Sequence, residues 1–189
     1  MKLCVSSAFS LCNKKTYLLI ILFLFCNLFF FSCDNKTKPK LPNFESKNFQ
    51  DKLVNANKIY VKKENDEIDQ YVAHRGWNMT ETGTGLRYMI VKKGTGELAK
   101  PDQHAKVNFK ISLLDGTLCY SSDSTGAKEF LIEQDDVESG LHEGIQYMHV
   151  GDKAIMILPS HLAHGLIGDQ SRIPPHASVM YELDLLSVR

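Results

Sequence analysis

Five histidines lie close together in the last third of the chain, and histidine is the side chain that most often binds metal ions. They fall within 35 residues: His142, His149, His161, His164 and His176. Their spacing does not favour a metal centre, because no cysteine or second cluster of carboxylates completes a tetrahedral ligand set. We therefore expect no metal and no cofactor, and a structural hydrogen-bonding role for His176 in its Pro-Pro-His turn.

The elements that position these histidines follow from residues 137–189. Leu141, Ile145 and Met148 share one face of a short amphipathic helix, with Gly151 where a C-terminal cap belongs. Residues 153–158 predict a strand, and a loop rich in histidine and glycine leads to a closing strand. In that strand two sets of residues alternate as in a half-buried strand: Val179, Tyr181, Leu183 and Leu185 on one side, and Met180, Glu182 and Asp184 on the other.

The residues upstream predict the rest of a sheet. Residues 86–91 form the first expected strand, and residues 106–113 alternate between apolar and polar side chains. Asp115-Gly116 then predicts a hairpin turn into residues 117–120. Phe130 and Ile132 mark one further strand. Five or six short antiparallel strands and one helix indicate an α+β arrangement.

The glycines and prolines of the last third form a pattern with a known counterpart. It comprises Gly140, Glu143-Gly144, Val150-Gly151, Gly165, Gly168, Ile173-Pro174-Pro175-His176-Ala177 and the closing Tyr181-Glu182-Leu183-Asp184-Leu185-Leu186. From about Leu86 to Arg189 the chain resembles the FK506-binding-protein (FKBP) type of peptidyl-prolyl isomerase. The resemblance implies an α+β fold, in which a curled antiparallel β-sheet wraps across one short helix with a pocket between them.

The chemistry implied by this resemblance is rotation about an X-Pro peptide bond. Rotation breaks amide resonance and crosses a barrier of about 18–20 kcal/mol, whereas the cis and trans states differ by only about 0.5–1 kcal/mol. An apolar cradle that excludes water favours the less polar, twisted amide by differential binding. Such an enzyme needs no nucleophile, metal or cofactor.

Four pocket positions implied by the resemblance keep an apolar character. Phe109 stands on the wall, Val137 and Ile173 offer backbone groups or apolar contact, and Tyr181 lies near the floor. The same four residues would point inward as ordinary core residues in any case. Only the existence of a pocket separates the two interpretations.

Other pocket positions depart from the family. Tyr120, which follows Cys119, stands where an acidic residue is usual, and Leu141 replaces a floor tryptophan. His164 replaces a tyrosine that donates a hydrogen bond, and Lys128 replaces a further aromatic residue. Loss of the acid weakens the expectation of efficient catalysis, although His164 still offers a donor.

The first 32 residues predict a lipoprotein signal peptide. Lys14-Lys15 precede the apolar run from Leu18 to Phe31, which suits a signal-peptide core better than a membrane span. Ser32-Cys33 resembles the end of the lipobox of bacterial lipoproteins, so Cys33 is the expected lipid-bearing residue. An uncleaved signal anchor is the alternative. Either outcome leaves the folded part in the cell envelope, anchored by lipid or signal to a membrane and facing the periplasm, with inner or outer membrane undecided.

The segment between Cys33 and the isomerase-like domain divides into a tether and an arm. Residues 33–50 are polar and predict a flexible tether, and residues 51–82 predict a helical arm before the domain of residues 83–189. Within the arm we expect a helix over residues 66–75, capped by Asn65 or Asp66 and ended by Gly76. Trp77 is expected to pack the arm onto the domain, with a partner-binding surface as the alternative.

Charge and cysteine content exclude several function classes. The chain of 189 residues has a formal net charge of zero and no basic patch, so we expect no nucleic-acid binding. Of the five cysteines, only Cys119 follows Cys33, which rules out a disulfide framework within the domain. We expect Cys119 to be a small buried residue and the protein to be a monomer.

Two functions remain open. The first is a membrane-anchored peptidyl-prolyl isomerase and folding helper for exported envelope proteins, with proline-containing segments as its partners. The second is a catalytically weak or inactive module that binds a proline-containing segment of an envelope complex. The whole layout resembles the gliding-motility-associated FKBP-type lipoproteins of Bacteroidetes, which implies a possible link to motility.

Overall fold

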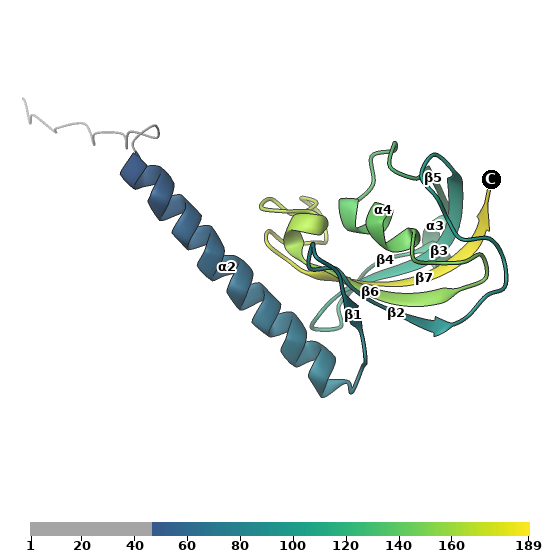
Figure 1. Cartoon of the computed structure of the whole chain (residues 1–189), viewed down its shortest axis with the longest axis horizontal. Coiled ribbons are helices and arrows are strands. Elements are labelled where there is room, and N and C mark those ends of the chain that lie inside the picture. Colours follow the sequence, from purple (N-terminus) through teal and green to yellow (C-terminus); the bar gives the residue numbers. More distant parts are fainter. Residues whose placement is uncertain (1–46) are drawn as a thin grey trace, which may run out of the picture. The chain divides into compact units, whose positions relative to one another are not determined.

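In the computed structural model, which describes residues 47–189, an antiparallel sheet curls around a short helix (Figure 1). The elements in chain order are α2 (Lys47–His74), β1 (Thr80–Glu81), β2 (Arg87–Lys92), β3 (His104–Leu113), β4 (Leu118–Ser121), α3 (Ser122–Thr125), β5 (Lys128–Leu131), α4 (Ser139–Ile145), β6 (Lys153–Leu158), the 3-10 helix η2 (Ser160–Leu162) and β7 (Val179–Val188). The sheet order is β1-β2-β6-β7-β3-β4, and β5 pairs with β3. The predicted α+β fold is confirmed, with seven strands in place of the expected five or six.

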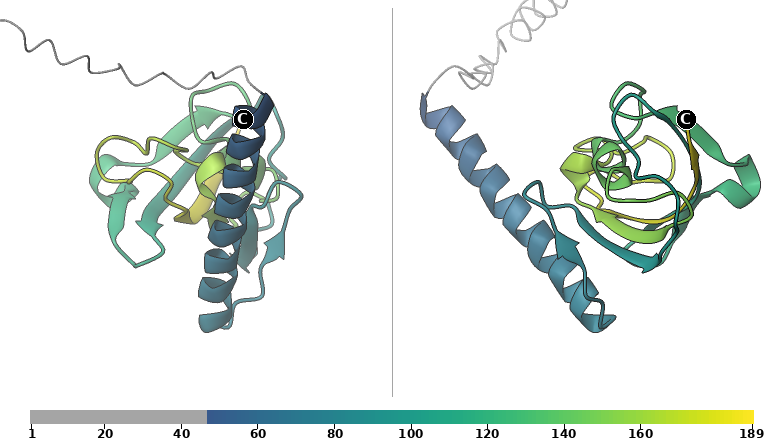
Figure 2. Two further views of the ribbon diagram at one scale, coloured as in Figure 1. Left: turned by 90° about the vertical axis from the view of Figure 1, so that its left-hand side faces the viewer. Right: turned by 45° about the vertical axis from the view of Figure 1, so that its right-hand side comes forward.

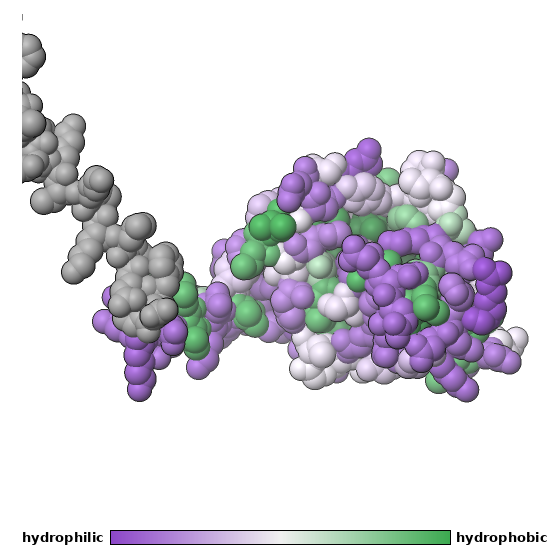
Figure 3. Space-filling model, turned by 90° about the horizontal axis from the view of Figure 1, so that it is seen from above, coloured by the Kyte–Doolittle hydropathy of each residue, from purple (hydrophilic) through white to green (hydrophobic). Residues whose placement is uncertain are grey.

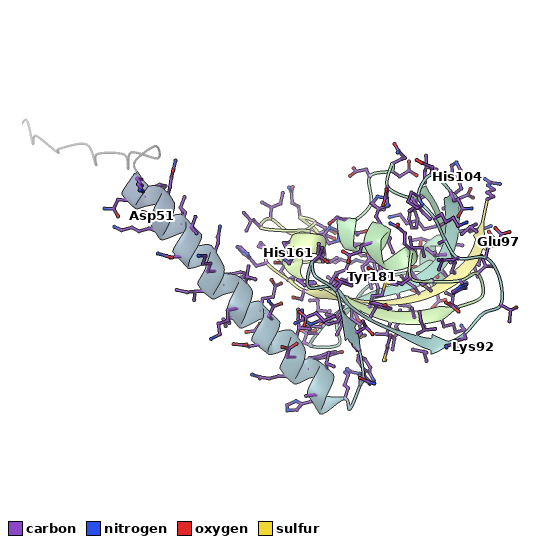
Figure 4. The ribbon with its side chains drawn as sticks, in the orientation of Figure 1. Asp51, Lys92, Glu97, His104, His161 and Tyr181 are labelled. Carbon is purple, nitrogen blue, oxygen red and sulfur yellow. The ribbon has the colours of Figure 1, made fainter. Side chains whose placement is uncertain are left out.

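The inner face of the sheet forms the main core with α4 (Figure 2). The alternation predicted for the closing strand is confirmed, because Val179, Tyr181, Leu183 and Leu185 all enter this core. Figure 4 shows Tyr181 on the inner side of the sheet, near α4. Cys119 is buried in the same core, as expected of a small apolar residue. The period-2 pattern of these strands thus fixes which side chains lie beneath the helix.

The outer face of the same strands packs against the end of the helical arm. Ile157 of β6 and Met180 of β7 bury Ile68 of α2 between them, and Trp77 packs against this second cluster. The prediction that Trp77 packs the arm onto the domain is confirmed. Because the arm covers this end of β6 and β7, Ile157 and Met180 are apolar on the outer face, whereas Glu182 and Asp184 further along the same face of β7 are polar.

The helical arm is longer than the sequence predicts. Residues 66–75 belong to a single helix of 28 residues that begins at Lys47 and ends at His74, so Asn65 and Asp66 are interior residues and do not cap it. No glycine or proline interrupts residues 47–74, which lets the helix continue past both polar residues. Gly76, with φ of 64°, lies just beyond the helix end, as predicted.

The central helix is shorter than its apolar spacing suggests. It ends at Ile145 with Gln146 as its C-cap, so Gly151 is not the cap. Residues after the helix instead pair with the segment 96–99, through Ala99 N–H to Met148 O at 3.0 Å and Val150 N–H to Glu97 O at 2.9 Å. These hydrogen bonds compete with further helical turns. Gly151, with φ of 91°, occupies the turn into β6.

The N-terminal predictions fall mostly beyond the described part of the chain. The signal peptide, Cys33 and residues 34–46 lie outside the described residues, and α2 begins within the range 33–50 expected for the tether. Residues 50–189 form one unit and residues 1–49 another. Within residues 47–189, no helix has the length and apolar character needed to cross a membrane.

In Figure 3, hydrophilic side chains cover most of the face seen from above, with small apolar groups between them.

Candidate functional site

A groove of about 320 Å³ opens at the beginning of α4. Its lining comes from three parts of the chain, namely β5, the start of α4 and the loop after η2: Lys128, Asp136, Val137, Glu138, Ser139, Ala163 and His164. Val137 and His164 are two of the seven predicted site residues, and Lys128 is the position where the family has an aromatic. Two of the seven predicted site residues therefore line this groove, and its lining is more polar than the apolar cradle that the resemblance implies.

A carboxylate that the sequence analysis did not single out lies in this groove. Glu138 Oε1 is 3.1 Å from His164 Nε2, and the two side chains are only 11% and 23% exposed. Glu138 Oε2 is buried and has no hydrogen-bond partner among the described residues. A buried carboxylate oxygen without a partner is costly, and because this oxygen is not exposed at the surface, it is not itself a contact for a bound peptide.

Three other predicted site residues are buried in the main core and do not line the groove. Leu141, Ile173 and Tyr181 are each 2% exposed and belong to one core cluster. Burial and then the nearby charge of Glu138 raise the pKa of Tyr181 well above its usual value. Tyr181 therefore keeps its proton at physiological pH.

A second carboxylate is held at Tyr120, the position where the family acid is missing. The Tyr120 hydroxyl donates to Asp169 Oδ2, and Asp169 Oδ1 accepts the backbone N–H of Ile173 at 2.7 Å and of Ser171 at 2.9 Å. The guanidinium of Arg172 lies 5.3 Å from the centre of the Tyr120 ring. Tyr120, Asp169 and Ile173 are thus joined in one hydrogen-bonded unit.

The environment of Asp169 keeps it ionised. Partial burial opposes ionisation, but hydrogen bonds from the Tyr120 hydroxyl and from the backbone of Ile173, Ser171 and Arg172 outweigh it and lower the pKa of Asp169 to about 2. The neighbourhood of Tyr120 therefore holds a permanent negative charge at neutral pH, supplied by a different residue from the one expected.

Phe109 stands apart from the groove. It packs against the edge of the main core, and its backbone N–H donates to Ser122 Oγ at 3.1 Å. It also borders a separate polar hollow of about 240 Å³ lined by residues such as Lys110 and Asp184. The structure thus brings Val137 and His164 into the groove and buries Leu141, Ile173 and Tyr181 in the core. Tyr120 is joined to Ile173 through Asp169.

The five histidines have separate partners. His142 Nδ1 accepts from Glu133 N–H at 2.9 Å, and His161 Nε2 lies 3.0 Å from Thr84 O. His176 makes its hydrogen bonds through its backbone, with its N–H donating to Gly165 O at 3.0 Å, while its ring Nδ1 has no partner in the described part of the chain. Within residues 47–189, no group of three or more potential ligands could hold a metal ion.

Comparison with known proteins shows which family this region is similar to. Residues 95–186 match the FKBP-type peptidyl-prolyl cis-trans isomerase family. We refer to the matched residues as the FKBP-type domain. The match begins just before β3 and extends through most of β7, so this FKBP-type domain contains the groove, α4 and all seven predicted site residues.

Two relatives and one solved structure extend the comparison. FkpA, an FKBP-type isomerase of Escherichia coli K12, is 32% identical over 108 residues, and FkpA of Aeromonas hydrophila is 39% identical over the same length. Both matches cover 57% of this chain and 39% of the relative, so the chain spans less than half of each relative. The crystal structure of E. coli FkpA superposes with a TM-score of 0.57 at 24% identity, covering 94% of this chain and 82% of that one.

Sequence reasoning missed the two acids of the site for different reasons. Glu138 directly follows Val137, which the resemblance placed in the pocket. A charged residue next to a predicted pocket residue could have been recognised as a candidate site residue. Asp169 is 49 residues from Tyr120 in the sequence, and only the folded loop brings them together. No local pattern marks such a pair in the FKBP-type domain.

Proposed function

We propose that this protein is a peptidyl-prolyl cis-trans isomerase that acts on proline-containing segments of exported envelope proteins. The observation that carries the proposal is the groove at the start of α4, in which apolar Val137 and Ala163 lie beside the partly buried His164. The family of the domain supports isomerase chemistry, and the groove offers both an apolar contact for a proline ring and polar groups for the peptide.

The polar groups of the groove suit a rotating amide. Glu138 is the N-cap of α4 and makes no side-chain cap hydrogen bond. Leu141 and His142 N–H already donate to Glu138 O, so only the N–H groups of Ser139 and Gly140 are left in the first turn for a peptide carbonyl. His164 Nε2 is buried and faces Glu138, so in this proposal the other ring nitrogen of His164 donates a hydrogen bond to the same segment. When the amide twists, its nitrogen becomes pyramidal and its resonance is lost, and a site that holds the flanking carbonyls fixed favours that state by differential binding.

The acid expected at Tyr120 is replaced in this proposal by Asp169. Its charge persists at neutral pH, and the Tyr120 hydroxyl fixes its orientation. Because the negative field comes from a loop residue, its position depends on the loop between β6 and β7. We expect weaker catalysis than in a protein with the acid on the sheet itself.

A comparison of two histidines on the same loop tests the proposal. In a protease-coupled assay with X-Pro peptides, we expect the full chain to accelerate isomerisation and His164→Ala to lower kcat/KM by about tenfold, as for loss of one hydrogen bond. His161→Ala is the matched control, because His161 is exposed and bonds to Thr84 O outside the groove. No acceleration by the folded wild-type chain, or equal losses in both variants, would contradict the proposal.

The second candidate is a binding module without catalysis. The observation that favours it is the charged lining of the groove, in which Lys128, Asp136 and Glu138 replace an aromatic cradle. Such a groove recognises a peptide through charge as well as through a proline ring. A fluorescent X-Pro peptide that binds the groove, together with no acceleration of isomerisation, is the result expected from this alternative.

Location and partners remain part of the proposal. We infer from the sequence pattern at Ser32-Cys33 that a lipid on Cys33 anchors a monomer to a membrane of the cell envelope, facing the periplasm. Mass spectrometry of the mature N-terminus, with a Cys33→Ala control, tests the anchor. The link to gliding motility rests on the resemblance to motility-associated lipoproteins, and a deletion strain that glides normally would exclude it.

A further inference from the structure

One buried carboxylate of the helical arm contacts both ends of the loop that carries the site. This loop, residues 159–178, connects β6 to β7 and contains His164, Asp169 and Ile173. Glu64 Oε1 accepts the backbone N–H of Ser160 at 2.7 Å and the hydroxyl of Ser178 at 2.6 Å, and Glu64 Oε2 accepts the Ser160 hydroxyl at 3.1 Å. The two serines lie 96 and 114 residues from Glu64 in the sequence.

The burial of Glu64 makes these contacts energetically important. Glu64 is only 5% exposed, and its neighbour Lys63 pairs with Glu67 instead, at 3.5 Å. Three donors from the loop ends are therefore what compensates the loss of hydration of this carboxylate. A change in the spacing of Ser160 and Ser178 leaves the charge buried and under-bonded, so the arm favours one conformation of the loop ends.

The region around the Glu64 hydrogen bonds is not closely packed, so packing alone does not hold the loop ends in place. A cavity of about 230 Å³ lies beside these hydrogen bonds and is lined by residues that include Tyr60, Glu64, Leu113 and His176. One turn before Glu64, the Tyr60 hydroxyl donates to His176 O at 3.1 Å, and the two rings lie 4.4 Å apart. Polar contacts with the arm thus hold a loop end that has space to move.

Other contacts dock the arm without touching this loop. Ile68 packs on Ile157 and Met180, and Asp69 pairs with Arg87 at 2.9 Å. Because docking has these separate supports, the contacts of Glu64 are directed specifically at the loop. We propose that Glu64 is a positioning residue, which sets the geometry of His164, Asp169 and Ile173 from outside the FKBP-type domain.

This inference rests on the proposed isomerase function, but it also makes a prediction about the loop alone. In hydrogen–deuterium exchange on the full chain, Glu64→Ala is expected to speed exchange of amides in residues 163–173 by about tenfold, as for loss of one charge-assisted hydrogen bond. The same variant is expected to lower kcat/KM by about tenfold. Glu64→Gln keeps an acceptor oxygen for Ser160 N–H and is expected to restore most of both values.

Two further variants make the experiment decisive. Asp69→Ala removes a carboxylate from the next turn of the same helix, and we expect loop exchange and kcat/KM to stay within twofold of wild type even where the melting temperature falls. Ser178→Ala removes one loop contact without changing the arm, and it replaces Glu64→Ala if that variant does not fold. Unchanged loop exchange in folded Glu64→Ala or Ser178→Ala, or an equal effect of Asp69→Ala, would overturn the proposal. A wild-type chain without isomerase activity would refute the proposed function, while the exchange data would still decide the role of Glu64.

Discussion

The core beneath α4 and the loop between β6 and β7 hold the two halves of the candidate site by different physical means. Leu141 and Tyr181 are fixed by burial among apolar neighbours. The loop is fixed by carboxylates, with Asp169 holding Tyr120 and Ile173 from within the loop and Glu64 holding its ends. Burial is non-directional, whereas charge-assisted hydrogen bonds specify geometry.

Because the core and the loop are held in these different ways, mutations in them should have different effects. The core holds Leu141 and Tyr181 by close packing among many apolar neighbours. The loop carries His164, which we propose contacts a peptide, and its position depends on a few polar contacts. Variants in the core should therefore change stability most, and variants in the loop should change the site with smaller losses of stability.

The largest loss of stability is expected for Tyr181 in the main core. Tyr181→Ala removes a side chain that is 2% exposed, and we expect the free energy of unfolding to fall by about 3–5 kcal/mol, as for other large aromatic deletions. Urea denaturation followed by circular dichroism measures it. Leu186→Ala on the same strand is the control, because Leu186 is 42% exposed and should cost about 0.5 kcal/mol or less. Similar losses in both variants would contradict the assigned core.

A smaller effect is expected inside the loop. Asp169→Asn removes the charge that accepts from Tyr120, Ser171 and Ile173, and we expect a loss of about 1–2 kcal/mol in the free energy of unfolding. Tyr120→Phe removes one partner and should cost about 0.5–1.5 kcal/mol. A double-mutant cycle should show that the two losses are not additive. Full additivity would mean that the Tyr120–Asp169 contact contributes little.

The pH dependence of the same loop has a defined sign. The folded-state pKa of Asp169 is about 2, below the value of about 3.9 expected in the unfolded chain. Its stabilising contribution is therefore complete above about pH 4 and is lost as the pH falls toward 2. The difference in urea midpoint between wild type and Asp169→Asn should shrink over this range. A difference that stays constant from pH 5 to pH 2 would show that the charge of Asp169 is not responsible.

The smallest effect is expected for an exposed ion pair on the arm. Lys63 and Glu67 lie 3.5 Å apart with side chains 75% and 59% exposed, so Glu67→Gln should change the free energy of unfolding by about 0.5 kcal/mol or less. The measurement is the same urea titration, with Glu64→Ala one turn earlier as the contrast, because it removes all three hydrogen bonds of a buried carboxylate. A loss at Glu67 as large as that at Glu64 would show that burial does not distinguish these two carboxylates.

The strands and the core of this protein could be predicted from the sequence because they depend on local periodicity. The alternation in β7 and the extent of β6 follow directly from the pattern of apolar residues. The end of α4 could not be predicted in the same way, because residues 148–150 pair with a distant segment that competes with the helix. Periodicity predicts which residues are buried, but it does not predict which backbone groups those residues form hydrogen bonds with.

The polar half of the site was largely beyond prediction. Glu64 lies in a run of charged residues that is typical of a solvated helix face, and only the docked loop makes it a buried residue with three bonds. Asp169 likewise gains its role from a tyrosine on another strand. Absence of the family acid at Tyr120 was visible in the sequence, whereas the Asp169 carboxylate that accepts the Tyr120 hydroxyl was not.

Two-dimensional exchange NMR on an X-Pro peptide tests the proposed isomerase site most directly, because it observes interconversion of the cis and trans signals without a coupling protease. With a small molar fraction of the full chain, we predict exchange cross-peaks between the two isomers that weaken strongly in His164→Ala and persist in His161→Ala. Peptide signals that shift on binding without any exchange cross-peak would contradict catalysis and leave a module that only binds.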